Sequence, residues 1–392
     1  MPKKHKRDPR HMRREFLTGV VFVLVGLGVT LLLERAHLLA WPQRALLDAM
    51  PDTLTSTAAR DLVIVTINDS DYAELFHRQS PLDPKQVAAI LGDIQFFSPR
   101  VIGIDLDTED WKPADSERVP KAPGRLVWAR LFTADPSAPL RIAELGKVQG
   151  SDGAGLCSGL TAMQADSDLR IRQYPAEYQQ LRGGQTVVYP SFPLVVLRMD
   201  TEGACPAGVE GSAEARTEGN WDENRLLIRY RGAGHDIRKI PAAAVIDTRE
   251  LARQAPDNPA VQQMKTLLGG RMVLLGGTYR AGRDSYPTPV GMVPGVEILG
   301  QAVLTASEGP IKEPGSGLVW FDLLLGLSLV VLGLWYPRTA MVLNISLLLL
   351  LLPLSGWLFR SFAFFLDAIP VQIGVLLHST LHPVLEKHVA RL

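Results

Sequence analysis

Residues 61–69, DLVIVTIND, and residues 98–107, SPRVIGIDLD, decide the fold of this chain. Each contains a continuous run of β-branched and other apolar residues, which is typical of a strand buried on both faces. Between them, residues 84–97 repeat apolar side chains at helical spacing, at Val87, Ile90, Leu91, Ile94 and Phe97. The sequence therefore predicts a strand–helix–strand unit over 61–106, with the right-handed crossover that joins parallel strands.

Further apolar runs continue this pattern along the chain. We expect strands in RLVWARLF (125–132), LLIRY (226–230) and RMVLLGG (271–277), helices at 191–199, 258–268 and 295–308, and loops over 133–164. Strands that alternate with helices favour a parallel sheet. The central part of the chain, 34–317, is therefore predicted to be one α/β domain with a largely parallel sheet.

Carboxylates follow the first two predicted strands. Asp69 and Asp71 come after the first, and Asp105 and Asp107 come after the second. Open α/β sheets bind ligands at the carboxyl ends of their strands, where these side chains could hold a divalent cation or recognise a basic ligand. The commoner alternative is that such residues cap the next turn or helix.

The third strong strand ends in a glycine turn. Gly276 and Gly277 are followed by Arg280, Arg283 and Asp284. Glycines let the backbone approach a ligand closely, and backbone amides beside Arg suit an anion. The pattern is neither a dinucleotide fingerprint nor a P-loop, so a structural turn is the commoner interpretation.

The chain carries no recognisable catalytic signature. There is no G-x-S-x-G and no H-E-x-x-H, and the eight His are scattered. We therefore predict no enzymatic activity, no catalytic residue, no bound cofactor and no metal site.

The apolar residues concentrate near the two ends of the chain. Phe16 to Leu33 contains no charged residue, and its 18 residues are about the length that crosses a bilayer. A signal peptide is the alternative interpretation, but no small-residue cleavage site follows. Residues 318–381 hold only Asp322, Arg338, Arg360 and Asp367 as charged residues. Breaks near 337 and 360 divide this stretch into predicted transmembrane helices at 318–336, 340–359 and 362–381.

Basic residues set the predicted orientation. Residues 1–15 are strongly basic, so the N-terminus is expected in the cytoplasm, and four spans return the tail 382–392 to the same side. The domain 34–317 is then periplasmic, in a bacterial inner membrane protein that contacts lipids. Its 30 Lys+Arg against 36 Asp+Glu exclude nucleic acid as a partner.

Cys157 and Cys205 both fall in this outer compartment. A disulfide can persist outside the cytoplasm, but the spacing alone leaves open whether the two are paired.

The order of these segments resembles the CHASE type 2 family of extracytoplasmic sensor domains. The resemblance covers 61–309 and is carried by VIVTINDSD (63–71), SPRVIGIDLD (98–107), DSDLRIRQYP (166–175), YPSFPLVVL (189–197) and above all GGRMVLLGGTYRAGRDSYPTPVGMVPGVEILGQAV (269–303). The family pattern has the same residues at four positions in the last block: Asp284 and the structural turn residues Gly276, Pro294 and Gly295. One departure is Asn68, where the family usually has Asp.

The resemblance implies a sensor that receives a signal outside the cytoplasm. Members normally continue into a cytoplasmic output domain, and this chain is expected to lack one, so the signal would pass through the helices to another protein. Homo-oligomerisation is also implied. The alternative is a non-catalytic docking subunit of an envelope complex. The predicted ligand site comprises Asp69, Asp105, Asp107, Arg283 and Asp284, with Arg170 and Arg172 as weaker members.

Overall fold

The structure of the chain is a computed structural model. It describes residues 61–108, 111, 126–130, 157–182, 185–205, 225–230 and 237–309, together with isolated helical positions between 17 and 48 and between 342 and 358. The chain divides into two compact units, one of residues 52–310 and one that joins residues 1–51 with 311–392.

A parallel sheet forms the centre of the first unit. Among the described residues it has six strands in the order β10-β1-β11-β2-β3-β4, and every neighbouring pair is parallel. The largely parallel α/β domain predicted from the sequence is therefore confirmed. The strands are β1 (Leu62–Ile67), β2 (Val101–Asp105), β3 (Leu126–Arg130), β4 (Cys157–Leu160), β10 (Arg238–Pro241) and β11 (Met272–Gly277).

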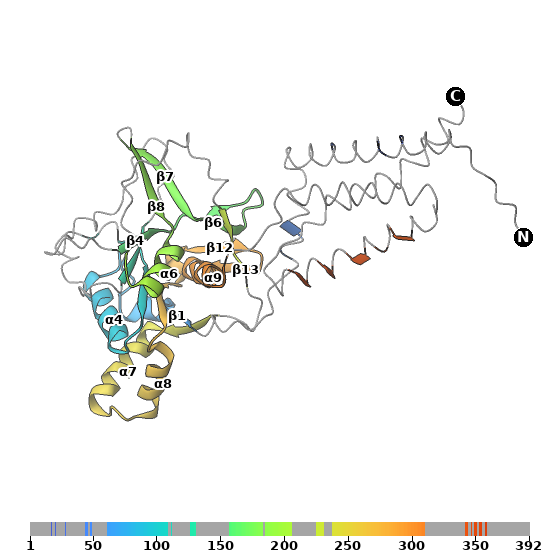
Figure 1. Cartoon of the computed structure of the whole chain (residues 1–392). Coiled ribbons are helices and arrows are strands. Elements are labelled where there is room, and N and C mark those ends of the chain that lie inside the picture. Colours follow the sequence, from blue (N-terminus) through green and yellow to red (C-terminus); the bar gives the residue numbers. More distant parts are fainter. Residues whose placement is uncertain are drawn as a thin grey trace, which may run out of the picture. The chain divides into compact units, whose positions relative to one another are not determined.

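Helices cover both faces of this sheet (Figure 1). Alternate residues of β1 point to opposite faces: Val63 and Val65 pack in one core cluster, and Leu62 and Ile64 in the other. The first cluster includes side chains of α4 (Pro84–Phe96), α7 (Ala242–Gln254) and α8 (Pro259–Leu268), and the second those of α6 (Phe192–Glu202) and α9 (Gly295–Glu308). A sheet buried on both sides explains why its strands have continuous apolar sequences.

Smaller antiparallel elements lie outside the main sheet. They are the three-stranded sheet of β5 (Gln164–Ala165), β6 (Ile171–Pro175) and β9 (Arg225–Leu227), the hairpin of β7 (Glu177–Arg182) and β8 (Gln185–Pro190), and the hairpin of β12 (Ser285–Thr288) and β13 (Gly291–Pro294). A third cluster packs Ile171, Tyr174 and Tyr230 against Ile298 and Ala302 of α9. One expectation was wrong here: β4 lies within the predicted loop 133–164. The strand expected at 226–230 is present as the shorter β9, in a small antiparallel sheet.

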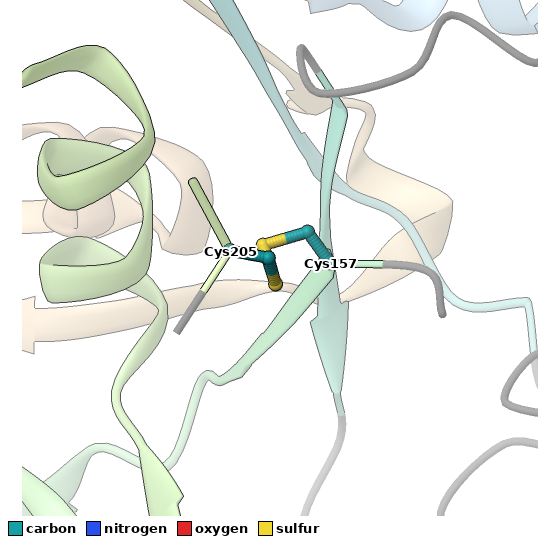
Figure 2. The surroundings of a disulfide bond; sticks show 2 residues. All are labelled: Cys157 and Cys205. Carbon is teal, nitrogen blue, oxygen red and sulfur yellow. A yellow bond between two sulfur atoms is a disulfide. The ribbon is translucent and has the colours of Figure 1, made fainter. Parts of the chain in front are cut away.

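A disulfide joins Cys157 and Cys205 (Figure 2). Cys157 begins β4 and Cys205 follows α6, and their Cα atoms are 5.4 Å apart. The bond closes a loop with a sequence separation of 48, which contains the β7–β8 hairpin. A cross-link over such a loop stabilises a domain by about 4 kcal/mol in the chain-entropy account.

The predicted membrane spans fall outside the described residues, apart from isolated positions. They are 16–33, 318–336, 340–359 and 362–381. Within the part of the chain that the structure describes, no helix has both the length and the apolar character needed to cross a bilayer. The four spans therefore stay predictions.

Candidate functional site

The carboxyl ends of three neighbouring strands form one edge of the sheet. β11 lies between β1 and β2, and its Gly276 pairs with Thr66 on one side and with Asp105 on the other. The residues that follow these strands in the sequence therefore meet at one place. The short α3 (Asp69–Glu74) follows β1, and the 3-10 helix η3 (Arg280–Gly282) follows β11.

Two carboxyl groups at this edge interact with each other. Burial, and secondarily the negative charge of Asp284, raise the pKa of Asp105 from 3.8 to about 8. The pKa of Asp284 is also raised by burial, although hydrogen bonds from the Tyr286 hydroxyl and the Gly295 amide oppose the shift. The described residues supply no hydrogen-bond donor to the Asp105 side chain, which is partly exposed. Asp105 is therefore the carboxyl group that can gain or lose a proton near neutral pH.

Tyr286 completes this group, which we call the Asp105–Asp284–Tyr286 cluster. Burial raises the pKa of Tyr286 to about 12, and the charge of Asp284 and the hydrogen bond to it add to the shift. The hydroxyl thus remains a hydrogen-bond donor across the physiological range. Tyr286 was not among the residues predicted for this site, although its position two residues after Asp284 was the available signal.

The cluster lies at the N-terminus of α9. Pro294, the residue before the helix, offers no side-chain cap. The Gly295 amide donates to the Asp284 main-chain carbonyl at 3.0 Å, and the Asp284 carboxylate lies against Gly295. A negative group is favourable at this end of a helix. A side chain at Gly295 would overlap the Asp284 carboxylate, and a Cβ at Gly276 would lie 2.5 Å from Val296. These two glycines let β11, Asp284 and α9 come into direct contact.

The carboxylates after β1 act as caps. Asn68 and Asp71 form a reciprocal capping box at the start of α3, in which Asp71 accepts the Asn68 amide at 3.1 Å. The buried Asp71 also accepts the Ala243 amide of α7 at 3.2 Å. Asp69 accepts the Arg280 amide of η3 at 2.8 Å. Asn68, which departs from the family pattern, is thus the N-cap of a helix.

An aromatic pair lies beside these caps. The rings of Tyr72 and Tyr279 stack with centroids 4.2 Å apart and planes 8° apart. Burial raises the pKa of Tyr279, with further contributions from Tyr72, Asp107 and Asp284. Asp107 and Asp284 are therefore close enough to Tyr279 to affect its titration, and the sequence analysis named neither tyrosine.

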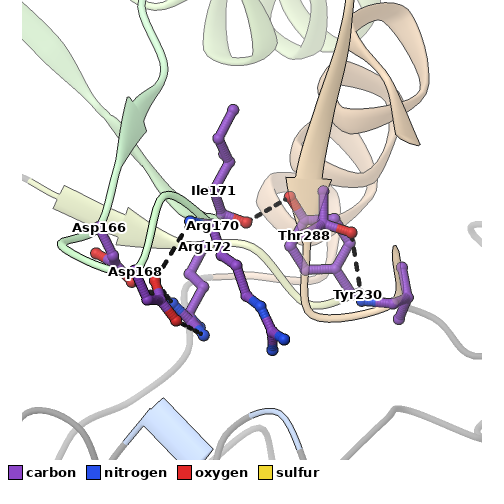
Figure 3. Close-up of polar contacts among 8 residues, drawn as sticks. Asp166, Asp168, Arg170, Ile171, Arg172, Tyr230 and Thr288 are labelled. Carbon is purple, nitrogen blue, oxygen red and sulfur yellow. Dashed lines mark hydrogen bonds and ion pairs between the residues drawn. The ribbon is translucent and has the colours of Figure 1, made fainter. Parts of the chain in front are cut away.

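The three predicted arginines differ in their surroundings. Arg172 is buried on β6, where it binds Asp168 through two contacts of 2.8 Å and Asp166 through one of 2.7 Å (Figure 3). Arg170 is exposed on the adjacent turn, and Arg283 is exposed at the end of η3. The structure therefore brings Asp69, Asp105, Asp107, Arg283 and Asp284 to one edge, whereas Arg172 is held in an ion-pair network on a separate sheet.

No metal centre is found in the described part of the chain. No group of three or more His, Cys, Asp or Glu side chains among these residues is arranged to hold a metal ion.

Comparison with known proteins gives one family match. Residues 17–336 match the model of the CHASE2 domain family. No curated protein and no solved structure matches the chain.

We predict that the stability of the domain falls as pH rises through the pKa of Asp105. A carboxyl whose pKa is raised in the folded state stabilises the fold below its unfolded pKa, and this contribution is lost as pH rises toward about 8. Thermal unfolding of the full chain in detergent between pH 5 and 9 measures this. Asp105→Asn should flatten the profile and raise Tm at pH 9. Superimposable profiles for the two proteins would contradict the assignment.

We also predict opposite effects for two glycine substitutions. Gly295→Ala should destabilise the domain by about 1–3 kcal/mol, because the new methyl group would meet the Asp284 carboxylate. Gly92→Ala is the matched control, because this position in α4 has open space and the change should stabilise the helix by up to about 1 kcal/mol. Denaturant unfolding measures both. Equal effects of the two changes would contradict the close contact at α9.

Proposed function

The chain belongs to the CHASE2 family of extracytoplasmic sensor domains, and on that premise we propose that it is a membrane-anchored signal-input protein of a bacterial envelope. A ligand or partner binds the outer domain, and the change passes through the C-terminal helices to a separate protein.

The signal is received at the Asp105–Asp284–Tyr286 cluster. Asp105 is partly exposed and its pKa is about 8, so small changes in its surroundings alter its charge. A ligand that donates hydrogen bonds or carries positive charge would favour the ionised form, whereas an empty site favours the protonated form. Binding therefore shifts a population between two charge states of this edge.

The signal is transmitted by α9. The amide of its first residue, Gly295, donates to the Asp284 main-chain carbonyl at 3.0 Å, and the Asp284 carboxylate lies against Gly295; this contact is the single observation that carries the proposal. The helix has 14 residues and is about 21 Å long. At its other end Glu308 lies 3.6 Å from Arg229, and the predicted span 318–336 begins shortly after. A rigid helix that is tied at one end to the cluster can carry a displacement to the other end.

Hydrogen–deuterium exchange of the full chain in nanodiscs tests this transmission, with the proton as the probe. At pH 9, where Asp105 is ionised, the first turn of α9 and peptides from 311–336 should exchange severalfold faster in the wild-type protein than in Asp105→Asn. At pH 6 the two proteins should agree, because the wild-type carboxyl is then protonated.

Asp93→Asn is the control for this experiment. Burial also raises the pKa of Asp93, but this residue lies on α4, so its substitution should leave α9 as in the wild type. Equal exchange in wild type and Asp105→Asn at pH 9 would refute the cluster as the receiving site. A response confined to α9, without 311–336, would refute the relay. A stoichiometric protein that co-purifies and suppresses the response would favour the docking alternative.

A further inference from the structure

We propose that two neighbouring turns of the outer domain rest on the lipid bilayer. The turns are 166–170, before β6, and 288–292, which comprises the end of β12, the two residues that follow it and the start of β13. Their exposed side chains Leu169, Arg170, Val290 and Met292 are called the tip surface below. The inference builds on the proposed function, because it takes the predicted span 318–336 to lie in the membrane.

Exposed apolar side chains in the described part of unit 52–310 gather on these segments. Five large ones are more than a third exposed, and four of them belong to the two turns or to β12: Leu169 at 71%, Met292 at 67%, Val290 at 44% and Tyr286 at 41%. The fifth, Phe96, is covered by the Arg249 guanidinium, 3.7 Å from the ring centroid. The tip surface is therefore the apolar patch that needs another occupant.

The two turns lie side by side. β6, which follows the first turn, and β12, which leads into the second, are neighbours, and Figure 3 shows residues 166–172 beside Thr288. Thr288 also fixes the second turn, because its hydroxyl donates to the Gly291 carbonyl at 2.7 Å. Side chains on both turns can thus contact one flat surface together.

Leu169 is held outward by the structure beneath it. Its φ is 64°, a left-handed conformation that leucine rarely adopts. The buried Arg172 holds the turn, since it binds Asp166 and Asp168, which both precede Leu169, and the Asp166 amide donates to the Arg170 carbonyl at 2.9 Å. Strain that is maintained by a buried ion pair is expected at a functional position.

The position of the first turn favours the bilayer as the occupant. The Ile228 amide donates to the Arg172 carbonyl at 2.7 Å, and the next residue, Arg229, contacts both Thr305 and Glu308 at the end of α9. The turn is therefore close to the point where the chain leaves the domain. Residues 310–317, which lead to the predicted span, reach at most about 30 Å.

Because the chain itself tethers the domain to the predicted span, weak lipid contacts are enough to orient the domain on the bilayer. A domain that is held near the bilayer by its own chain meets it at high effective concentration, so a few inserted side chains can fix its orientation. Arg170 is exposed beside Leu169, where its guanidinium suits lipid phosphates. A net negative outer domain argues that apolar insertion, rather than charge, provides the main contact.

Single labelled cysteines test the tip surface, since the described native cysteines are both in the disulfide. Leu169→Cys and Met292→Cys are labelled with an environment-sensitive dye in the full chain, reconstituted in phosphatidylcholine nanodiscs with or without nitroxide lipid. Both labels should shift to the blue and be quenched severalfold more than a label at Lys265→Cys on α8, which is exposed. Quenching equal to that at Lys265 would overturn the proposal.

Two further arms separate the remaining explanations. A label at Leu350→Cys, inside the predicted span 340–359, should be quenched strongly by the nitroxide lipid. Weak quenching at this position would refute the proposed membrane topology. Strong quenching at 350 without quenching at the tip surface would refute this inference alone. If the labels at the tip surface are shielded both from lipid nitroxide and from aqueous iodide, the tip surface contacts a second protein, and the lipid proposal is overturned.

Discussion

The close approach of the Asp284 carboxylate to Gly295, the first residue of α9, is the constraint on which the edge of the sheet depends. It requires glycine at 295, because any side chain there would occupy the space of the carboxylate. It also places a negative group beside Asp105, which adds to the effect of burial on that carboxyl. This close approach therefore explains a backbone requirement, a negative group at the N-terminus of α9 and part of the raised pKa of Asp105.

Carboxylates with similar positions in the sequence serve different purposes in this fold. Asp71 accepts the backbone amides of Asn68, the N-cap of α3, and of Ala243 in α7, so it contributes to the architecture. Asp105 receives no donor from the described residues. This difference separates carboxyls that hold helices in place from one that can respond to a ligand. The difference favours Asp105 as the residue that responds to the signal and α9 as the element that transmits it.

Much of the fold could be predicted because its central strands and α9 have long, strongly patterned sequences, and α9 was expected at 295–308 as observed. β4 was missed because it has four residues, CSGL, with no apolar run. Capping by Asp71 was the commoner interpretation from the sequence, whereas its bond to Ala243 and the stacking of Tyr279 could not be predicted, since they depend on distant segments. The Arg172 pairs were within reach, because Asp166 and Asp168 are sequence neighbours.

The titration of Asp105 tests the account most directly. Infrared difference spectra of the full chain, recorded against Asp105→Asn, isolate the carboxyl band of this residue. The account predicts that the band titrates with an apparent pKa near 8, and that Asp284→Asn moves the pKa of Asp105 downward by removing the neighbouring negative charge. A wild-type band that titrates near 4 and does not respond to Asp284→Asn would contradict it.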